Sequence, residues 1–535
     1  MRRLVCAAVL ALLSLSAQAF CGFYAGKADA SLFNEASQVV IARDGPRTVL
    51  TMVNDYKGAL TEFALVVPTP QVIREGQVRV VDKAVVEHLD AFSAPRLAEY
   101  HDPDPCRFDF RWGEIPYLPA PVSVIAYAAM PAAKSARDAA LGVTVEARYT
   151  LEEYDIVSLS ATQSDGLETW LTENGYRIPK GASAALRPYI NQGMKFFVAK
   201  VNLQNQAQTG YTTLRPLQFA FESEKFMLPM RLGMLNAPPD KPQDLIVYVL
   251  SAKGRVESSS YRTARLPTGV NLPFFAKPVF KQVYQDMFSE QARREDYRVV
   301  WTEYFWNMGF CDPCAAEPLT LQEQRKLGAF WVGGGDPVQN FKALVTPGAE
   351  AGKMDAALVN QRGGWGSPVM VTRLHLRYTA NSFPEDLMLT QTSDQQNWQA
   401  RYVIQQPYDG SLPACFANLN GKDCAALCRP KVASWLSAKG LYREKLAVDS
   451  DDPAVLQRDC ESVCTATKQA GLQAAGHYYQ HELPERIQRE KLALAQLTGW
   501  PLPRVDALPD AQRYDMPASV PDKLDKPWWQ RLFGR

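Results

Sequence analysis

The amino-acid sequence predicts an α+β protein: a β-rich body with a few inserted helices, followed by a C-terminal α-helical hairpin linked by disulfides. Two observations predict the body. Between Phe20 and about Ser260, short runs of β-branched and aromatic residues end at turn residues. Helical periodicity interrupts these runs at only a few places. The third observation is that the chain turns helical and rich in cysteine after Cys415, which predicts the hairpin.

The strands of the body are placed by the turns that end them. Segments 39–42 and 48–53 flank Asp44-Gly45-Pro46, which predicts a β-hairpin. Further strands are expected at 63–67, 143–149, 196–203, 217–221 and 245–250, and another β-rich stretch at about 368–408.

The inserted helices are placed by their capping residues. Asp165 is the expected N-cap of a helix whose apolar face includes Leu167 and Leu171, and Gly175 is expected to end it. Two more helices are expected at 182–191 and 278–298, and a capping box, Thr320-x-x-Glu323, predicts another helix that begins near Thr320.

The length of 535 residues allows two to four compact domains. We expect a signal peptide, a β-rich α+β domain, a second α+β portion with a Cys-x-x-Cys motif, a cysteine-rich helical hairpin and a disordered tail rich in Pro and Asp. Their expected limits are 1–19, 20–270, 271–410, 411–500 and 501–535.

The first 19 residues have the three parts of a secretory signal peptide: the basic pair Arg2-Arg3, the apolar run 4–15 and the small-residue site Ala17-Gln18-Ala19. We expect cleavage before Phe20 and export to the periplasm or the extracellular space, without a lipid anchor. No later segment has the roughly 18 consecutive apolar residues of a membrane-spanning helix. The 58 basic and 57 acidic residues give no indication of binding to nucleic acid.

Ten cysteines are present, and Cys6 leaves with the signal peptide, so an odd number remains. Cys424 and Cys428 are four residues apart, as are Cys460 and Cys464, so each pair lies on one helix face. Two antiparallel helices with this spacing predict nested bridges, 424 to 464 and 428 to 460. A metal site with four thiolates is the alternative, which an oxidising compartment disfavours. Elimination then pairs Cys21 with Cys106 and leaves Cys415 unpaired, although spacing alone does not determine connectivity.

The motif Cys311-Asp312-Pro313-Cys314 follows an aromatic run, as in thiol-disulfide oxidoreductases of the thioredoxin type. Such enzymes place the dithiol at a helix N-terminus, whose dipole stabilises the thiolate. Here the capping box places the next helix six residues beyond Cys314, and the charge of Asp312 raises the thiol pKa. A local disulfide between Cys311 and Cys314 is therefore favoured over a redox site.

Each remaining candidate site is better explained as a structural feature than as a catalytic or metal-binding site. His477 and His481, one helical turn apart, are candidate metal ligands but have no third ligand nearby. His101, Asp102 and Asp104 lie in a Pro-rich stretch that directs alternate side chains apart. Nucleophile, phosphate-loop and dinucleotide motifs are not found, and no cofactor is indicated. The tail carries the aromatic residues Trp528, Trp529 and Phe533, which suit an interface with a membrane or partner.

Four longer motifs carry a family resemblance. They are "AFCGFYAGKADASLFNEASQVVIARDGPRTVLTMVNDYKGALTEFALVVPTP" at 19–70, "YHDPDPC" at 100–106, "TWLTENGYRIPKGA" at 169–182 and "EYFWNMGFCDPC" at 303–314. With them the chain resembles a family of exported bacterial proteins catalogued as domain of unknown function 2330. The resemblance covers the mature N-terminus to about residue 405. It implies export and supplies no reaction, cofactor or catalytic residue.

We therefore expect an exported bacterial envelope protein with a structural or interaction role and an unknown partner, rather than an enzyme. The alternative is a thiol-disulfide oxidoreductase with Cys311 as nucleophile and Cys314 as resolving thiol.

Overall fold

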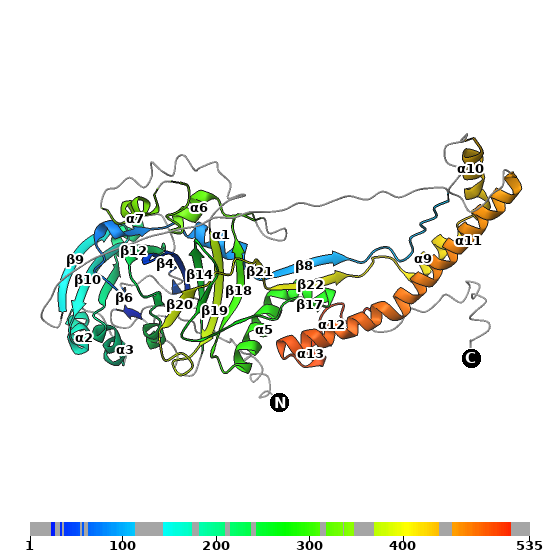
Figure 1. Ribbon diagram of the computed structural model, residues 1–535. Coiled ribbons are helices and arrows are strands. Elements are labelled where there is room, and N and C mark those ends of the chain that lie inside the picture. Colours follow the sequence, from blue (N-terminus) through cyan, green and yellow to red (C-terminus); the bar gives the residue numbers. More distant parts are fainter. Residues whose placement is uncertain are drawn as a thin grey trace, which may run out of the picture. The chain divides into compact units, whose positions relative to one another are not determined.

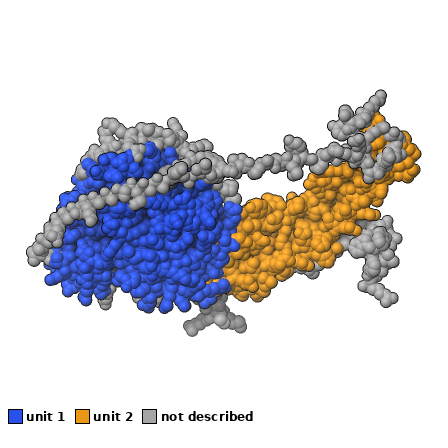
Figure 2. Space-filling view, viewed as in Figure 1, with its two compact units in different colours: residues 1–96, 127–268, 291–401 blue, residues 97–126, 269–290, 402–535 orange. Residues whose placement is uncertain are grey.

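The computed structural model describes residues 23–26, 33–34, 37–53, 56–57, 63–112, 143–173, 181–208, 214–236, 242–310, 317–334, 336–346, 369–437 and 452–514 (Figure 1). The chain forms two compact units, coloured separately in Figure 2. The first comprises residues 1–96, 127–268 and 291–401, and the second comprises 97–126, 269–290 and 402–535. These limits differ from the expected domains, because strands from 20–270 and 271–410 share one sheet.

That sheet is the largest of the first unit, with the strand order β16-β18-β19-β14-β3-β4-β12-β7 and with β21 beside β18. Its strands β3 and β14 pair in parallel, whereas β3 and β4 form the predicted hairpin. The strands are β3 (Ser37–Asp44), β4 (Arg47–Val53), β7 (Val78–Val80), β12 (Leu217–Glu222), β14 (Gln243–Ser251), β16 (Arg262–Arg265), β18 (Val299–Asn307), β19 (Met370–Tyr378) and β21 (Trp398–Gln399).

A second sheet of the first unit is antiparallel throughout, in the order β1-β6-β11-β10-β9. Three of its five strands cover segments in which the sequence predicts strands. The five are β1 (Phe23–Gly26), β6 (Phe63–Thr69), β9 (Val143–Leu151), β10 (Tyr154–Ala161) and β11 (Lys195–Val201).

The core of the first unit lies between these two sheets. Alternate residues of β3 show why: Val39 and Ile41 pack into the core between the sheets, whereas Val40 and Ala42 pack on the opposite face. Helices α1 (Lys83–Ser93), α6 (Leu321–Lys326) and α7 (Pro337–Val345) cover that opposite face, and α2 (Ser164–Glu173) and α3 (Ala182–Asn191) cover the outer face of the second sheet. The first unit is thus a four-layer α-β-β-α arrangement.

Helix starts agree with the capping signals with one exception. The Thr320 capping box is confirmed, because the Glu323 backbone N–H donates to Thr320 Oγ1 at 3.1 Å and the Thr320 N–H donates to Glu323 Oε2 at 2.8 Å. Asp165 is not the N-cap of α2, since the helix already includes Ser164. Instead, Asp165 lies in the first turn and accepts a hydrogen bond from Ser183 Oγ at 2.5 Å.

Shorter elements complete the first unit. A small sheet has the order β13-β20-β15, and β2 pairs with β5. They are β2 (Phe33–Asn34), β5 (Tyr56–Lys57), η1 (Glu75–Gln77), α4 (Leu203–Gln208), β13 (Met227–Leu228), η2 (Arg231–Asn236), β15 (Val256–Ser258) and β20 (Leu387–Gln391).

The second unit combines a three-stranded sheet, β17-β22-β8, with a succession of helices. The disordered tail is expected to start at residue 501, but residues 501–514 contain a helix, and Val505 and Ala511 are buried. Among the described residues, no helix is long and apolar enough to cross a bilayer. The elements are β8 (Arg96–His101), β17 (Val270–Leu272), η3 (Phe274–Val279), α5 (Phe280–Arg294), β22 (Arg401–Gln406), α9 (Leu412–Asn420), α10 (Cys424–Ser437), α11 (Pro453–His477), η5 (Tyr478–Glu482), α12 (Leu483–Thr498) and α13 (Leu502–Asp506).

Candidate functional site

The disulfides of the second unit contain the predicted nested pair. Cys424 is bonded to Cys464 and Cys428 to Cys460, with Cα–Cα distances of 5.7 and 5.8 Å. The bridges join α10 to α11 in the antiparallel arrangement that the four-residue spacing predicts. Pro430 lies inside α10, which nevertheless continues to Ser437.

A third disulfide corrects the expected pairing of Cys21 with Cys106. Cys106 is bonded to Cys415, with a Cα–Cα distance of 5.3 Å, so Cys415 is not the unpaired cysteine. The reason is strand pairing: β8 precedes Cys106, β22 precedes α9 with its Cys415, and β8 and β22 are neighbours in one sheet. Cys21 lies outside the described residues.

Aromatic side chains cover the nested disulfides. Cys428, Cys460 and Cys464 are fully buried in a cluster that contains Trp112. Trp112 Nε1 donates to a carboxylate oxygen of Asp459 on α11 at 3.0 Å, which holds the indole in place. Because thiol-disulfide exchange needs access for an attacking thiolate, this cover favours a structural role for these bridges.

The redox candidates Cys311 and Cys314 lie outside the described residues, as do Trp528, Trp529 and Phe533. The described residues after Cys314 show where the next helix begins. Helix α6 begins only at Leu321, after the Thr320 cap, as the capping box predicts. His88 on α1 further fixes this helix start, because its Nδ1 lies 2.8 Å from Glu323 Oε1.

A buried charged cluster, which the sequence does not predict, lies in the first unit on β18 and β19. Glu303 has no partner in the register between these strands, so it is the extra residue of a β-bulge. One carboxylate oxygen of Glu303 lies 2.5 Å from His375 Nδ1, and the other accepts from Arg373 Nε at 2.5 Å. Glu303 is fully buried, so these two partners compensate a charge that water does not reach.

The cluster extends across the sheet to α1 and β14. Arg373 Nη1 donates to Asp90 Oδ1 on α1 at 2.7 Å, and Tyr248 Oη donates to the same oxygen at 2.5 Å. Asp244 on β14 accepts two hydrogen bonds from Arg377 at 2.6 Å each. Burial raises the pKa of Asp244, but its bonds to Arg377 and His375 outweigh burial and lower the pKa to about 2.

His375 is the titratable centre of this cluster. Burial lowers its pKa, but the charge and hydrogen bond of Glu303, together with Asp244, whose Oδ1 lies 3.7 Å from His375 Nε2, raise the pKa above its ordinary value. The cluster thus places the imidazole of His375 between the carboxylates of Glu303 and Asp244, which favours its protonated form. This is the arrangement of an ion network that joins strands. The one sequence signal for it is the alternation Arg373-x-His375-x-Arg377 in a strand, which places three basic groups on one sheet face.

Asp102 in the second unit takes part in an ion pair. The Arg486 guanidinium donates to its two carboxylate oxygens at 2.8 and 2.7 Å, and Tyr478 also donates to it. These bonds outweigh burial and lower the pKa of Asp102. His477 and His481 are both exposed, with ring centroids 5.8 Å apart. Within the described part of the chain, no group of three or more His, Cys, Asp or Glu residues is placed to hold a metal ion.

Glu490 on α12 is a buried carboxyl group beside this ion pair. It is 3% exposed, neither of its carboxylate oxygens accepts a hydrogen bond, and Arg486 Nε lies 3.7 Å away. Burial, with a further contribution from the charge of Asp102, raises its pKa to about 7, although Arg486 and Arg489 oppose the shift.

Glu490→Gln is expected to stabilise the second unit in a pH-dependent way. A carboxyl group whose pKa rises on folding costs nothing below its unfolded pKa of about 4.3. Its cost grows as the pH rises to about 7 and then stays constant. The variant should therefore match the parent near pH 4 and exceed its free energy of unfolding by up to about 3 kcal/mol at pH 8. Chemical denaturation at both pH values measures this. The matched control is Glu485→Gln on the exposed face of α12, and an equal gain at pH 4 and pH 8 would contradict the assignment.

Comparison with known proteins gives one family match. The family described as an uncharacterized protein conserved in bacteria (DUF2330) matches residues 15–390. No curated protein and no solved structure shows significant similarity to the chain. The match contains the buried charged cluster of the first unit. Of the disulfide-bonded cysteines in the described part of the chain, Cys106 lies within the match and the other five lie after its end, in or beyond α9.

Proposed function

We propose that this chain, which belongs to the uncharacterized bacterial family DUF2330, is an exported envelope protein with a structural or interaction role. The observation that carries the proposal is the set of three disulfides in the second unit. Disulfides persist in the periplasm and outside the cell and are rare in the bacterial cytosol. The signal-peptide pattern of residues 1–19 supports the same compartment.

The second unit supports a scaffolding role within such a protein. Helix α11 has 25 residues, so it is about 38 Å long. Two disulfides join the first half of α11 to α10. Further along, Gly471 of α11 lies against Leu419 of α9. Helix α9 is in turn bonded to Cys106 through its Cys415. Two crosslinks between α10 and α11, and a third between α9 and the turn after β8, hold the shape of these helices. Helix α11 alternates buried with exposed residues along its length. Such a surface is suited to a protein or envelope partner.

The non-catalytic role is supported by how the acidic and basic groups are used. Two buried carboxylates pair with basic groups of the protein: Glu303 with Arg373 in the first unit, and Asp102 with Arg486 in the second. A general acid or base needs a reacting group within hydrogen-bond reach. At Glu303 and Asp102, protein groups occupy those positions.

Export and oxidation can be tested together in cells. We expect the full chain, expressed in a Gram-negative host, to yield a product that begins at Phe20 in the periplasm or medium, with the three bridges found by mass spectrometry. Leu12→Arg is the control, because a charge in the apolar run blocks recognition of a signal peptide; its product should stay in the cytosol with reduced thiols. An uncleaved, reduced parent protein would refute the proposal.

The alternative activity, a thiol-disulfide oxidoreductase, depends on Cys311 as nucleophile and Cys314 as resolving thiol. Cys314→Ala would trap mixed disulfides between Cys311 and substrate proteins if this activity existed. We expect no trapped partners on non-reducing gels, with Cys311→Ala/Cys314→Ala as the matched control. Adducts that require Cys311 would favour the enzyme over the scaffold.

A further inference from the structure

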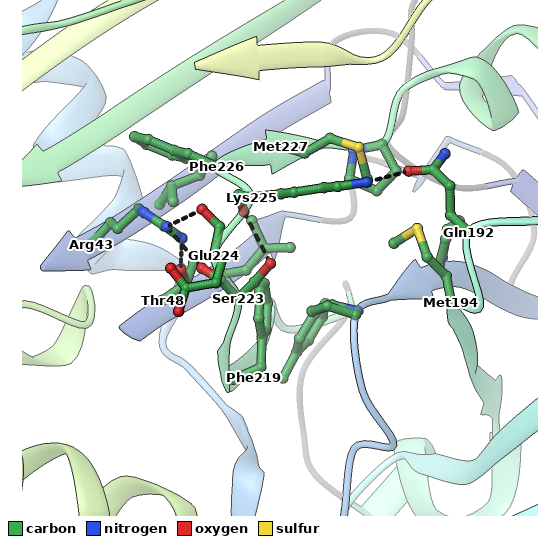
Figure 3. A pocket seen from close by; sticks show the side chains of 16 residues that line it. Arg43, Thr48, Gln192, Met194, Phe219, Ser223, Glu224, Lys225, Phe226 and Met227 are labelled. Atoms are coloured by element: carbon green, nitrogen blue, oxygen red, sulfur yellow. Dashed lines mark hydrogen bonds between the residues drawn. The ribbon is translucent and has the colours of Figure 1, made fainter. Parts of the chain in front are cut away.

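A pocket of about 240 Å³ opens at one end of the core between the two sheets of the first unit (Figure 3). Phe219 and Phe221 of β12 line it from the larger sheet, and Pro68 of β6 and Met194 before β11 line it from the second sheet. These four side chains are buried and apolar. The pocket is therefore an unfilled extension of the hydrophobic core that reaches the surface.

Arg43, at the end of β3, places a guanidinium in this apolar wall. Its Nη1 donates to Thr48 Oγ1 at 2.7 Å, and its Nη2 donates to the backbone oxygens of Ser223 at 2.8 Å and Glu224 at 3.3 Å. The centre of the guanidinium lies 4.8 Å from the Phe226 ring centroid. The Nε–H takes no part in these bonds, so it remains able to donate to a bound group.

The surroundings leave this cation poorly solvated. Burial lowers the pKa of Arg43 to about 10, and the charge of Glu224 only partly opposes the shift. A partly buried cation of this kind gains from an anionic partner.

Lys225 adds a second positive charge at the mouth. Its side chain extends toward Gln192, and its Nζ donates to Gln192 Oε1 at 2.9 Å, as Figure 3 shows. Lys225 and Gln192 are both exposed, so this contact can exchange for another acceptor at little cost. Among the described lining residues, two cations face the single carboxylate of Glu224, and an anion is the complementary ligand.

We propose that this pocket binds a small organic anion, with its apolar body between Phe219 and Met194, its carboxylate at the Arg43 guanidinium, and Lys225 as a second positive charge at the mouth. A cavity of roughly 150 Å³ already accepts benzene, so 240 Å³ admits an aromatic ring or a short acyl chain. The combination of apolar walls with a few charged groups is typical of small-molecule sites. The site goes beyond the proposed scaffold role and does not depend on export.

Binding can be measured on the purified, oxidised full-length mature protein by NMR and calorimetry, with octanoate as the probe. Octanoate is expected to bind at least roughly tenfold more tightly than 1-octanol, because a hydrogen bond to a charged group contributes more than a neutral one. Octylamine, with the opposite charge, should not bind. Equal affinity for all three compounds, or no binding of octanoate, would overturn the proposal.

Substitutions of the lining residues test whether octanoate binds in this pocket. Arg43→Gln should weaken octanoate binding roughly tenfold and leave 1-octanol unchanged, whereas Arg148→Gln, on the exposed face of β9, removes the same charge elsewhere and should change neither. Met194→Trp should fill the pocket and abolish binding of both compounds. If Arg43→Gln unfolds, Lys225→Gln decides, because this exposed residue should weaken octanoate alone by roughly threefold. Octanoate binding that is insensitive to both Lys225→Gln and Met194→Trp would place it elsewhere and refute the site.

Discussion

Glu303→Gln is expected to lower the free energy of unfolding of the first unit by roughly 3 to 5 kcal/mol. The substitution removes the carboxylate that pairs with Arg373 and His375, while both basic groups remain buried in the sheet. Arg373 keeps Asp90 and His375 keeps Asp244, but removing one partner of a buried ion pair costs far more than the loss of a surface ion pair. Chemical denaturation of the full-length protein, followed by fluorescence, measures the change.

Two further variants separate the ion network from a simple packing defect. Glu224→Gln removes an exposed carboxylate of the same unit and should change stability by less than about 0.5 kcal/mol. The triple variant Glu303→Gln/Arg373→Met/His375→Leu should be more stable than Glu303→Gln alone, because the charges that pair with Glu303 are removed with it. A loss below about 1 kcal/mol for Glu303→Gln would show that Arg373 and His375 do not need this carboxylate.

The pH dependence of the same variant follows from His375. Its pKa is raised in the folded state, so its stabilising contribution is complete below the unfolded pKa of about 6.5 and is lost as the pH rises through the higher folded value. The parent should therefore lose stability across this interval. Glu303→Gln should flatten that part of the profile, because Glu303 is the charge that most raises the pKa.

Cys106→Ser/Cys415→Ser is expected to lower the free energy of unfolding of the second unit by roughly 4 kcal/mol. This bridge closes a loop with a sequence separation of 309, and the loss of entropy that a crosslink imposes on the unfolded chain grows with loop length. It also connects the segment after β8 to α9. Denaturation midpoints of the second unit, reported by Trp112 and Trp435, measure the effect.

The nested hairpin supplies the matched control. Cys428→Ser/Cys460→Ser removes a bridge of separation 32, but Cys424–Cys464 still closes nearly the same loop. The entropic effect of this second pair should therefore be much smaller than that of Cys106–Cys415. If the two double variants are equally destabilised, loop closure is not the source of the stability.

Local signals predicted much of the secondary structure. The β3–β4 hairpin follows from β-branched runs around Asp44-Gly45-Pro46, and α6 follows from the Thr320 capping box. The nested bridges were predictable because a separation of four residues places two cysteines on one helix face. Asp165 shows the limit of such signals, since Ser164 already belongs to its helix and end positions vary by one or two residues.

Contacts between distant segments were not predictable in this way. The pairing of Cys106 with Cys415 depends on β8 lying beside β22. Segment 271–410 is shared between the two units, because its β18 and β19 join the sheet of β3 and β14. Glu303 gave no signal as a site residue, because only the bulge in β18 aims it between Arg373 and His375.

The sequence by itself therefore determined the α+β class, the family resemblance and the crosslinked hairpin, since each depends on residues close together in the chain. The tertiary structure alone decided the third disulfide, the limits of the two units, the buried charged cluster and the pocket at Arg43. These features form where strands far apart in sequence become neighbours, and strand order is set by the burial of two sheet faces at once rather than by any local pattern.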